Sequence, residues 1–244
     1  MKTYVINLEK DKARKVYMQK ILQKQHIENV FFVNAVYGKN LTSEEKDRQF
    51  DSNKFLRKYA KKPNAAQIGC TLSHRKCLEE FSKSGEQCCL ILEDDIEPKG
   101  EMLPVINEIQ KFLEVQAKPT IVLLSGWFWY TKKNNLENVV LGRLFSGFLA
   151  HSYMLNVPGC KLLLSEKPYF VADDWYEFRK KLGIKIYGLI PHSVNQRWNG
   201  DFLSSTQSHE IKYEKGFVIT KLSLRFRGLI QKILSVLGMF EKEK

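Results

Sequence analysis

The stretch Cys88-Cys89-Leu90-Ile91-Leu92-Glu93-Asp94-Asp95 joins five apolar residues directly to three acids. An unbroken apolar run of this length is typical of a strand that is buried on both faces of a parallel sheet. Acids at its carboxyl end would lie where open α/β sheets bind their ligands. The stretch therefore predicts both a central strand and a candidate site.

Strand-length apolar runs alternate with helix-like patterns on both sides of this stretch. The predicted strands are 5–8, 30–33, 88–92 and 120–124, and the predicted helices are 11–25, 65–81 and 102–115. The polar and charged residues 43–64 predict a loop with helical pieces. Alternation of this kind predicts an α/β fold with a mostly parallel, doubly wound central sheet flanked by helices.

Length, charge and cysteine content narrow the possible functions. We expect one globular domain over residues 1–210 and a tail over 211–244. The net charge of +12 implies an anionic partner, but no nucleic-acid-binding motif accompanies it.

Five cysteines without a C-x-x-C pair predict reduced, mostly buried thiols. With no signal peptide and no long apolar run, we expect a protein on the cytoplasmic side.

The acids after the predicted strand suit a divalent cation. Because strand side chains alternate, Glu93 and Asp95 are expected to share a face. Carboxylates gathered there repel one another, and an oxygen-preferring cation would neutralise them. The alternatives are an exposed acidic loop or a helix N-cap. A glycosidase is a poor fit, because adjacent acids cannot flank a substrate from opposite sides.

Four blocks of sequence, in this order, resemble glycosyltransferase family 25, the lipooligosaccharide galactosyltransferase group. They are Ile6-Asn7-Leu8 followed by Arg14, then Asn34-Ala35-Val36-Tyr37-Gly38-Lys39, Gly69-Cys70-Thr71-Leu72-Ser73-His74 and Leu92-Glu93-Asp94-Asp95. Three later segments extend the resemblance to about residue 210: Ala150-His151-Ser152-Tyr153-Met154-Leu155, Val171-Ala172-Asp173-Asp174, and Pro191 with Gln196.

This resemblance implies a GT-A type fold and an inverting sugar transfer. The implied donor is a UDP-sugar, with galactose or a related hexose, and the implied acceptor is a lipooligosaccharide, capsule or other glycan or glycolipid of the cell surface. It also implies a divalent cation, Mn²⁺ first and Mg²⁺ as the alternative, held by Asp95 and Glu93. The competing hypothesis is a family member without turnover that binds a membrane or glycan, and the intact acidic cluster argues against it.

The resemblance also assigns candidate site residues. The donor-binding candidates are Asn7, Arg14, Ser73, His74, Glu93, Asp94, His151, Tyr153 and Gln196. Each has a structural alternative, such as a solvated arginine, a buried histidine or a packed aromatic side chain. The third metal ligand stays unassigned between His192 and His209.

An inverting transfer also needs a general base for the acceptor hydroxyl. Asp174 is the first candidate and Asp173 the second, since the family usually shows an apolar residue at position 173. Either acid could instead cap a helix that starts near Trp175. The aromatic group Trp127-Phe128-Trp129-Tyr130 is a candidate sugar platform, with core packing as the alternative.

The segment from 221 to 240 predicts a basic amphipathic helix. From Ile211 onward there are eight lysines and arginines but only three glutamates. A helix of this type can lie in the interface of an anionic bilayer, where a lipid-linked acceptor would be found. We therefore predict peripheral attachment to the inner face of the cytoplasmic membrane. Docking on the main domain or on a partner subunit is the alternative, and a homo-oligomer is left open.

Overall fold

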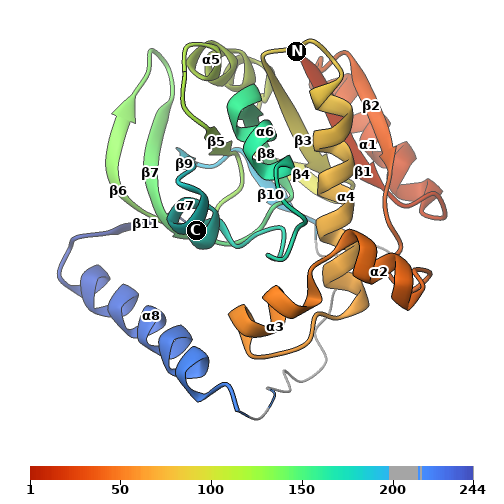
Figure 1. The fold of residues 1–244 in the computed structure, drawn as a ribbon. Coiled ribbons are helices and arrows are strands. Elements are labelled where there is room, and N and C mark those ends of the chain that lie inside the picture. Colours follow the sequence, from red (N-terminus) through yellow and green to blue (C-terminus); the bar gives the residue numbers. More distant parts are fainter. Residues whose placement is uncertain (198–213, 215, 244) are drawn as a thin grey trace.

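The computed structural model describes residues 1–197, 214 and 216–243, and their elements follow the predicted alternation (Figure 1). The helices are α1 (Lys12–Lys24), α2 (Ser43–Gln49), α3 (Ser52–Tyr59), α4 (Ala65–Ser82), α5 (Leu103–Glu114), α6 (Val157–Leu164), α7 (Trp175–Leu182) and α8 (Val218–Val236). The strands are β1 (Lys2–Asn7), β2 (Val30–Asn34), β3 (Cys88–Glu93), β4 (Ile96–Pro98), β5 (Thr120–Leu123), β6 (Phe128–Asn135), β7 (Val140–Gly147), β8 (Ser152–Asn156), β9 (Lys185–Ile190), β10 (Val194–Gln196) and β11 (Glu241–Glu243).

A nine-stranded mixed sheet in the order β11-β6-β7-β9-β5-β8-β3-β1-β2 forms the centre of the fold. Strands β2, β1 and β3 are mutually parallel, and β5 is parallel to β9. Strand β8 lies antiparallel between β3 and β5, and β7, β6 and β11 add antiparallel pairs at the far edge. Six of the nine strands thus point the same way, but the antiparallel insertions were not predicted.

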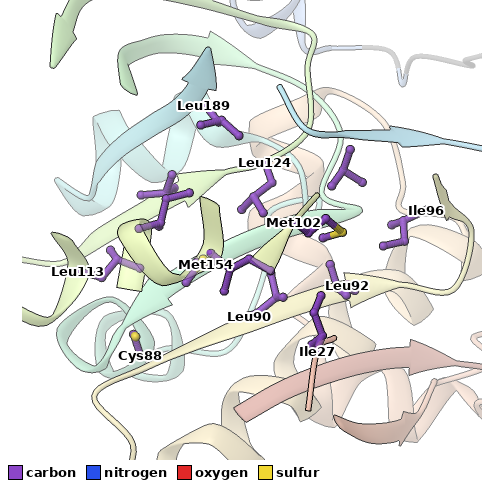
Figure 2. Close-up of a cluster of buried hydrophobic side chains, with 14 of the residues drawn as sticks. Ile27, Cys88, Leu90, Leu92, Ile96, Met102, Leu113, Leu124, Met154 and Leu189 are labelled. Carbon is purple, nitrogen blue, oxygen red and sulfur yellow. The ribbon is translucent and has the colours of Figure 1, made fainter. Parts of the chain in front are cut away.

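The central strand β3 is buried on both faces, as its apolar run predicts. Leu90 and Leu92 face a core that contains side chains from α1 and α5 (Figure 2). Cys89 and Ile91 face a second core, which α4, α6 and α7 cover. Helices on both faces bring the carboxyl end of β3 to an edge of the sheet where a ligand can approach.

Two of the sequence blocks are in direct contact, through glycines. A Cβ atom on Gly69 of α4 would lie 2.6 Å from the carbonyl oxygen of Val36, in the loop after β2. The Ser73 hydroxyl accepts a hydrogen bond from the Val36 N–H at 2.8 Å and donates to the Gly69 carbonyl at 2.7 Å. This contact fixes the loop against α4.

The cysteines and the C-terminal helix complete the description. All five cysteines are free thiols, and every one except the partly exposed Cys70 is buried.

Helix α8 ends before Phe240, whose ring stacks on Phe145 at 4.2 Å, and β11 then pairs with β6. Among the described residues, no helix has both the length and the apolar character needed to cross a bilayer.

The close approach at Gly69 generates a stability prediction. Gly69→Ala should lower the free energy of unfolding by roughly 1–3 kcal/mol, because the new methyl group meets backbone that cannot yield easily. Gly100→Ala is the matched control, since nothing lies within 4 Å of a Cβ there. Urea denaturation followed by circular dichroism measures both, and equal stabilities would refute the packing argument.

Candidate active site

A cleft of about 360 Å³ opens at the carboxyl ends of β1 and β3. Its lining comes from the β1–α1 turn, the loop after β2, helix α4, the end of β3 and strand β10. The lining residues are Ile6, Leu8, Lys10, Asp11, Arg14, Ala35, Val36, Tyr37, Gly38, Lys39, Ala66, Cys70, Ser73, His74, Glu93, Asp94, Asp95 and Gln196. Six of the predicted site residues and the predicted metal ligand Asp95 thus share one cavity.

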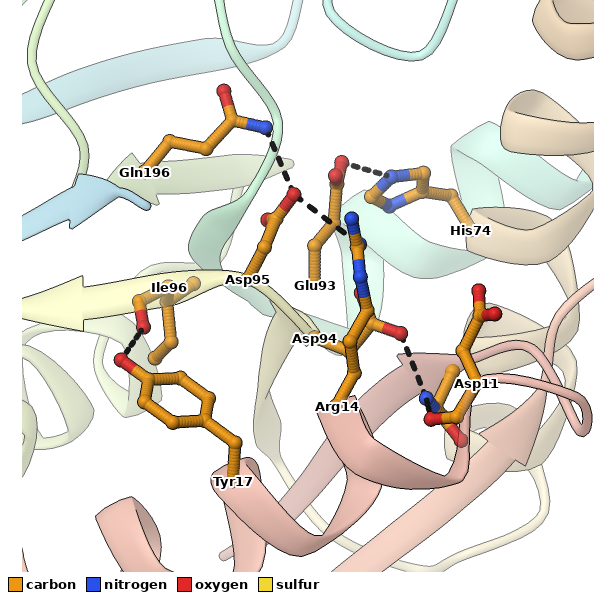
Figure 3. Close-up of polar contacts among 10 residues, drawn as sticks. Asp11, Arg14, Tyr17, His74, Glu93, Asp94, Asp95, Ile96 and Gln196 are labelled. Atoms are coloured by element: carbon orange, nitrogen blue, oxygen red, sulfur yellow. Dashed lines mark hydrogen bonds and ion pairs between the residues drawn. The ribbon is translucent and has the colours of Figure 1, made fainter. Parts of the chain in front are cut away.

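The three acids gather at the floor of this cleft, but not by strand alternation (Figure 3). Strand β3 ends at Glu93, and Asp94 and Asp95 form a turn. The expectation that Glu93 and Asp95 share a strand face was therefore wrong. The turn lets each carboxylate contact a different group of partners.

Asp94 is neutralised within the protein. Its Oδ2 accepts a hydrogen bond from the Asn7 side chain at 2.7 Å, and its Oδ1 accepts one from Arg14 at 2.8 Å. Burial raises the pKa of Asp94, although these two hydrogen bonds oppose the shift. Asn7 and Arg14 thus hold the acidic turn against the first strand-to-helix connection.

Asp95 is the least satisfied of the three acids. Its Oδ2 accepts from Gln196 at 3.1 Å and contacts Arg14 at 3.5 Å. Its Oδ1 is buried and has no hydrogen-bond partner among the described residues. Burial, with the charge of Glu93, raises the pKa of Asp95 to about 7. This carboxylate therefore has an oxygen available for a ligand.

Glu93 contacts a histidine on α4. His74 Nε2 lies 3.3 Å from Glu93 Oε1, and His74 Nδ1 lies 3.1 Å from the Tyr153 hydroxyl. Burial acts to raise the pKa of Glu93, but the hydrogen bond and charge of His74, with the charges of His151 and Arg14, outweigh it and leave the pKa lowered. Glu93 is therefore the readily ionised acid of the cluster.

The two predicted base candidates have different surroundings. Asp174 caps α7 and accepts a hydrogen bond from the buried Tyr59 hydroxyl at 2.7 Å. Asp173 accepts from the Leu149 N–H at 3.3 Å. Burial raises the pKa of Asp173, and the charges of Asp174 and Glu93 act in the same direction. Asp173 is thus the acid that is electrostatically linked to the cleft.

His151 lines a second cavity, next to the first. Residues Glu97, Gly126, Trp127, Phe148, Leu149, His151, Val194, Asn195 and Gln196 surround it, and Gln196 also lines the first cleft. His151 is 2% exposed, and neither ring nitrogen makes a hydrogen bond to a described residue. Burial lowers the pKa of His151, and the charge of Glu93 acts in the opposite direction.

The remaining candidates from the sequence are the aromatic group 127–130 and the two late histidines, His192 and His209. Phe128 and Tyr130 are buried in the core, whereas Trp127 is 51% exposed and lines the second cavity. His192 is buried and its Nδ1 lies 2.6 Å from Glu243. His209 lies outside the described residues.

Several cleft residues were not predicted individually. Lys10, Tyr37 and Lys39 line the cleft, and the ammonium of Lys10 lies 4.3 Å from the Tyr37 ring. Tyr37 and Lys39 belong to a block already noted for its resemblance, so their place in that block was a usable signal. Arg197 donates its backbone N–H to the Asp95 carbonyl at 2.7 Å, and no sequence pattern marked it.

The structural comparisons gave distant matches. "Crystal Structure of A197 from STIV" has a TM-score of 0.41 and 12% identity, covering 86% of this chain and 100% of that chain. A putative glucose-1-phosphate thymidylyltransferase from Bacillus anthracis, in complex with a sucrose, has a TM-score of 0.39 and 9% identity, covering 77% of this chain and 86% of that chain.

The sequence comparisons gave one family. No curated protein matches the chain. The family model described as glycosyltransferase family 25 (LPS biosynthesis protein) matches residues 1–164, a range that includes the blocks from β1 to β3 and the acidic turn. The chain therefore belongs to glycosyltransferase family 25, and it is a glycosyltransferase of lipopolysaccharide biosynthesis that acts on a sugar donor and a glycan acceptor.

Proposed function

We propose that this enzyme has a GT-A type fold and transfers a hexose, with galactose as the first candidate, from a UDP-sugar to a lipooligosaccharide, capsule or other cell-surface glycan. The transfer inverts the anomeric carbon and depends on a divalent cation. The observation that carries this proposal is Asp95: a buried carboxylate with a raised pKa and an oxygen that has no described partner, on the floor of the cleft.

The residues present fit a divalent cation. Two carboxylates, Glu93 and Asp95, lie beside each other, and the charge of Glu93 raises the pKa of Asp95. Such a pair of hard oxygen ligands suits Mn²⁺, with Mg²⁺ as the alternative. Asp95 and Glu93 would hold the ion, which when bound stabilises the diphosphate leaving group.

Cationic side chains at the cleft would contact the anionic donor directly. Arg14 is already held by Asp94 at 2.8 Å, so its guanidinium is oriented before the donor arrives. Lys10 and Lys39 add positive charge on the wall formed by the β1–α1 turn and the loop after β2. His74 lines the same cleft and would help to orient the nucleotide diphosphate, whereas Glu93 would act on it through the cation.

Asp173 is the proposed general base in place of Asp174. Its pKa is raised and it is linked to Glu93 by charge, whereas Asp174 is committed to the α7 cap and to Tyr59. Asp173 would take the proton of the acceptor hydroxyl as that oxygen attacks the anomeric carbon. The acceptor sugar would lie in the second cavity, where Trp127 and Phe148 expose aromatic surface.

Helix α8 is the proposed membrane contact, at the inner face of the cytoplasmic membrane. Its exposed apolar side chains include Leu222, Phe226, Leu229, Ile230, Ile233, Val236 and, just beyond its last residue, Leu237. The helix is long enough to lie in a bilayer interface, and the basic composition of this segment favours anionic lipid. The acceptor glycolipid would then be presented from the same surface.

A metal and pH experiment tests the Asp95 assignment. The folded pKa of Asp95 is about 7, against 3.8 for a free side chain, so the folded protein retains a proton here between those values. The resulting stabilisation is present in acid and is lost as the pH rises through about 7. A metal needs the ionised form, so the rise in Tm with Mn²⁺ should grow from about pH 6 to about pH 8.

Asp95→Asn should abolish this pH-dependent rise and reduce Mn²⁺-dependent UDP release by roughly 100-fold or more. Asp11→Asn is the control, because Asp11 lines the same cleft outside the acidic turn. Thermal shift and UDP release from a panel of UDP-sugars are the measurements. Equal Mn²⁺ responses in the two variants would refute the assignment.

The base assignment is tested by a matched pair of variants. Asp173→Asn should lower kcat by roughly 100-fold or more while the Kd for UDP is unchanged, because only proton transfer is lost. Asp174→Asn should keep most of the activity, since asparagine can still cap α7 and accept from Tyr59. The reverse order of activities would return the role to Asp174.

The membrane proposal is tested by substitution, because truncation would also remove β11 from the edge of the sheet. The triple variant Phe226→Gln, Leu229→Gln, Ile233→Gln should bind anionic vesicles at least about 100-fold more weakly and retain transfer to a soluble acceptor. Val16→Gln with Phe31→Gln is the control, since both residues are exposed elsewhere. Equal vesicle sedimentation of both variants would refute the proposal.

A further inference from the structure

A second set of metal-binding side chains lies on the inner wall of the donor cleft. Cys70 and His74 come from α4 and Glu93 from the end of β3, and one ligand atom from each lies within 4.8 Å of the other two. Because Cys70 and His74 are four residues apart on one helix, their side chains share a face of α4. This set contains a sulfur and a nitrogen, unlike the all-oxygen pair of Glu93 and Asp95.

The spacing is close to that of a tetrahedral zinc site. Zinc bonds of about 2.0–2.3 Å to sulfur, nitrogen and oxygen place the ligand atoms about 3.3–3.8 Å apart. His74 Nε2 and Glu93 Oε1 are already 3.3 Å apart. Moving the Cys70 thiol by about 1 Å, which rotation of a side chain can supply, would complete a three-ligand set.

The surroundings of this set also resemble those of a metal centre. Zinc-binding histidines are usually held through the second ring nitrogen. Here His74 Nδ1 lies 3.1 Å from the hydroxyl of the buried Tyr153, and the two rings stack at 5.7 Å. Cys70 lines the cleft and is the one cysteine of this chain whose residue is not fully buried.

We propose that Cys70, His74 and Glu93 bind Zn²⁺ through three protein ligands, with a fourth position open to the cleft, and that bound Zn²⁺ inhibits the enzyme. The choice of zinc follows from the thiol and imidazole, which favour it over Mn²⁺. Inhibition follows because zinc takes Glu93 and His74 away from the donor. That consequence rests on the proposed donor site, whereas zinc binding does not.

Spectroscopy of the full chain with Co²⁺ as a zinc substitute tests the binding directly. Wild type should show a sulfur-to-cobalt charge-transfer band that Zn²⁺ removes and excess Mn²⁺ does not. Cys70→Ser and His74→Gln should lose this band and bind zinc at least roughly 10-fold more weakly by calorimetry. Cys160→Ser is the control thiol variant and should keep the band, because Cys160 is buried between α6 and α4.

Asp95→Asn separates the two proposals. It should keep the cobalt band and zinc affinity although it loses the response to Mn²⁺. A missing band in wild type, or equal zinc affinity in Cys70→Ser, overturns the zinc site and leaves the transferase proposal intact. If the band depends on Cys70 but UDP release is equally fast without added metal, the zinc site stands. Only the proposal of metal-dependent transfer is then refuted. Zinc inhibition is measured as the rate with zinc divided by the zinc-free rate of the same variant. If Cys70→Ser is inhibited as strongly as wild type on this measure, the proposal is also contradicted.

Discussion

The crowding of three consecutive carboxylates at the end of a buried strand is the constraint on which this structure depends. Each acid has different main partners. Asn7 and Arg14 donate hydrogen bonds to Asp94, His74 contacts Glu93, and Gln196 satisfies Asp95 only in part. Charges in such a position must be paired or neutralised, because desolvation is costly. The groups that do this come from β1, α1, α4 and β10, so the acidic turn determines where four elements must meet.

A second constraint, close backbone packing at two glycines, brings widely separated sequence blocks together. The block after β2 has to pack on α4 through Gly38 and Gly69, because any larger residue would meet backbone atoms. Ser73 completes this contact with two hydrogen bonds and contributes to the site by position more than by chemistry. The adjacent His74 is thereby directed at Glu93. The block from Gly69 to His74 therefore serves partly for packing and only partly for ligand binding.

Much of the fold followed from local sequence. The predicted strands and helices from β1 to β5 match the observed elements within a few residues, because apolar periodicity is set by burial. The antiparallel placement of β8 between β3 and β5 could not be predicted in this way, since pairing partners depend on the whole chain. The three acids were found because they follow a buried strand. The sequence ranked Asp174 ahead of Asp173 as the base candidate. The proposed exchange rests on the hydrogen bond from Tyr59, which lies 115 residues from Asp174 and leaves no signal in the local sequence.

Strand β11 has a consequence for how this protein is made. It pairs with the first three residues of β6 at the open edge of the sheet, and Tyr130 there donates a hydrogen bond to Glu241, which is synthesised 111 residues later. Until the ribosome has released that segment, the β6–β7 hairpin presents unpaired backbone groups, which are a template for association with other chains. The polar residues Thr131-Lys132-Lys133-Asn134 along β6 reduce this hazard. Nascent chains of this enzyme should therefore depend on chaperones most strongly in the interval between the emergence of β6 and that of β11.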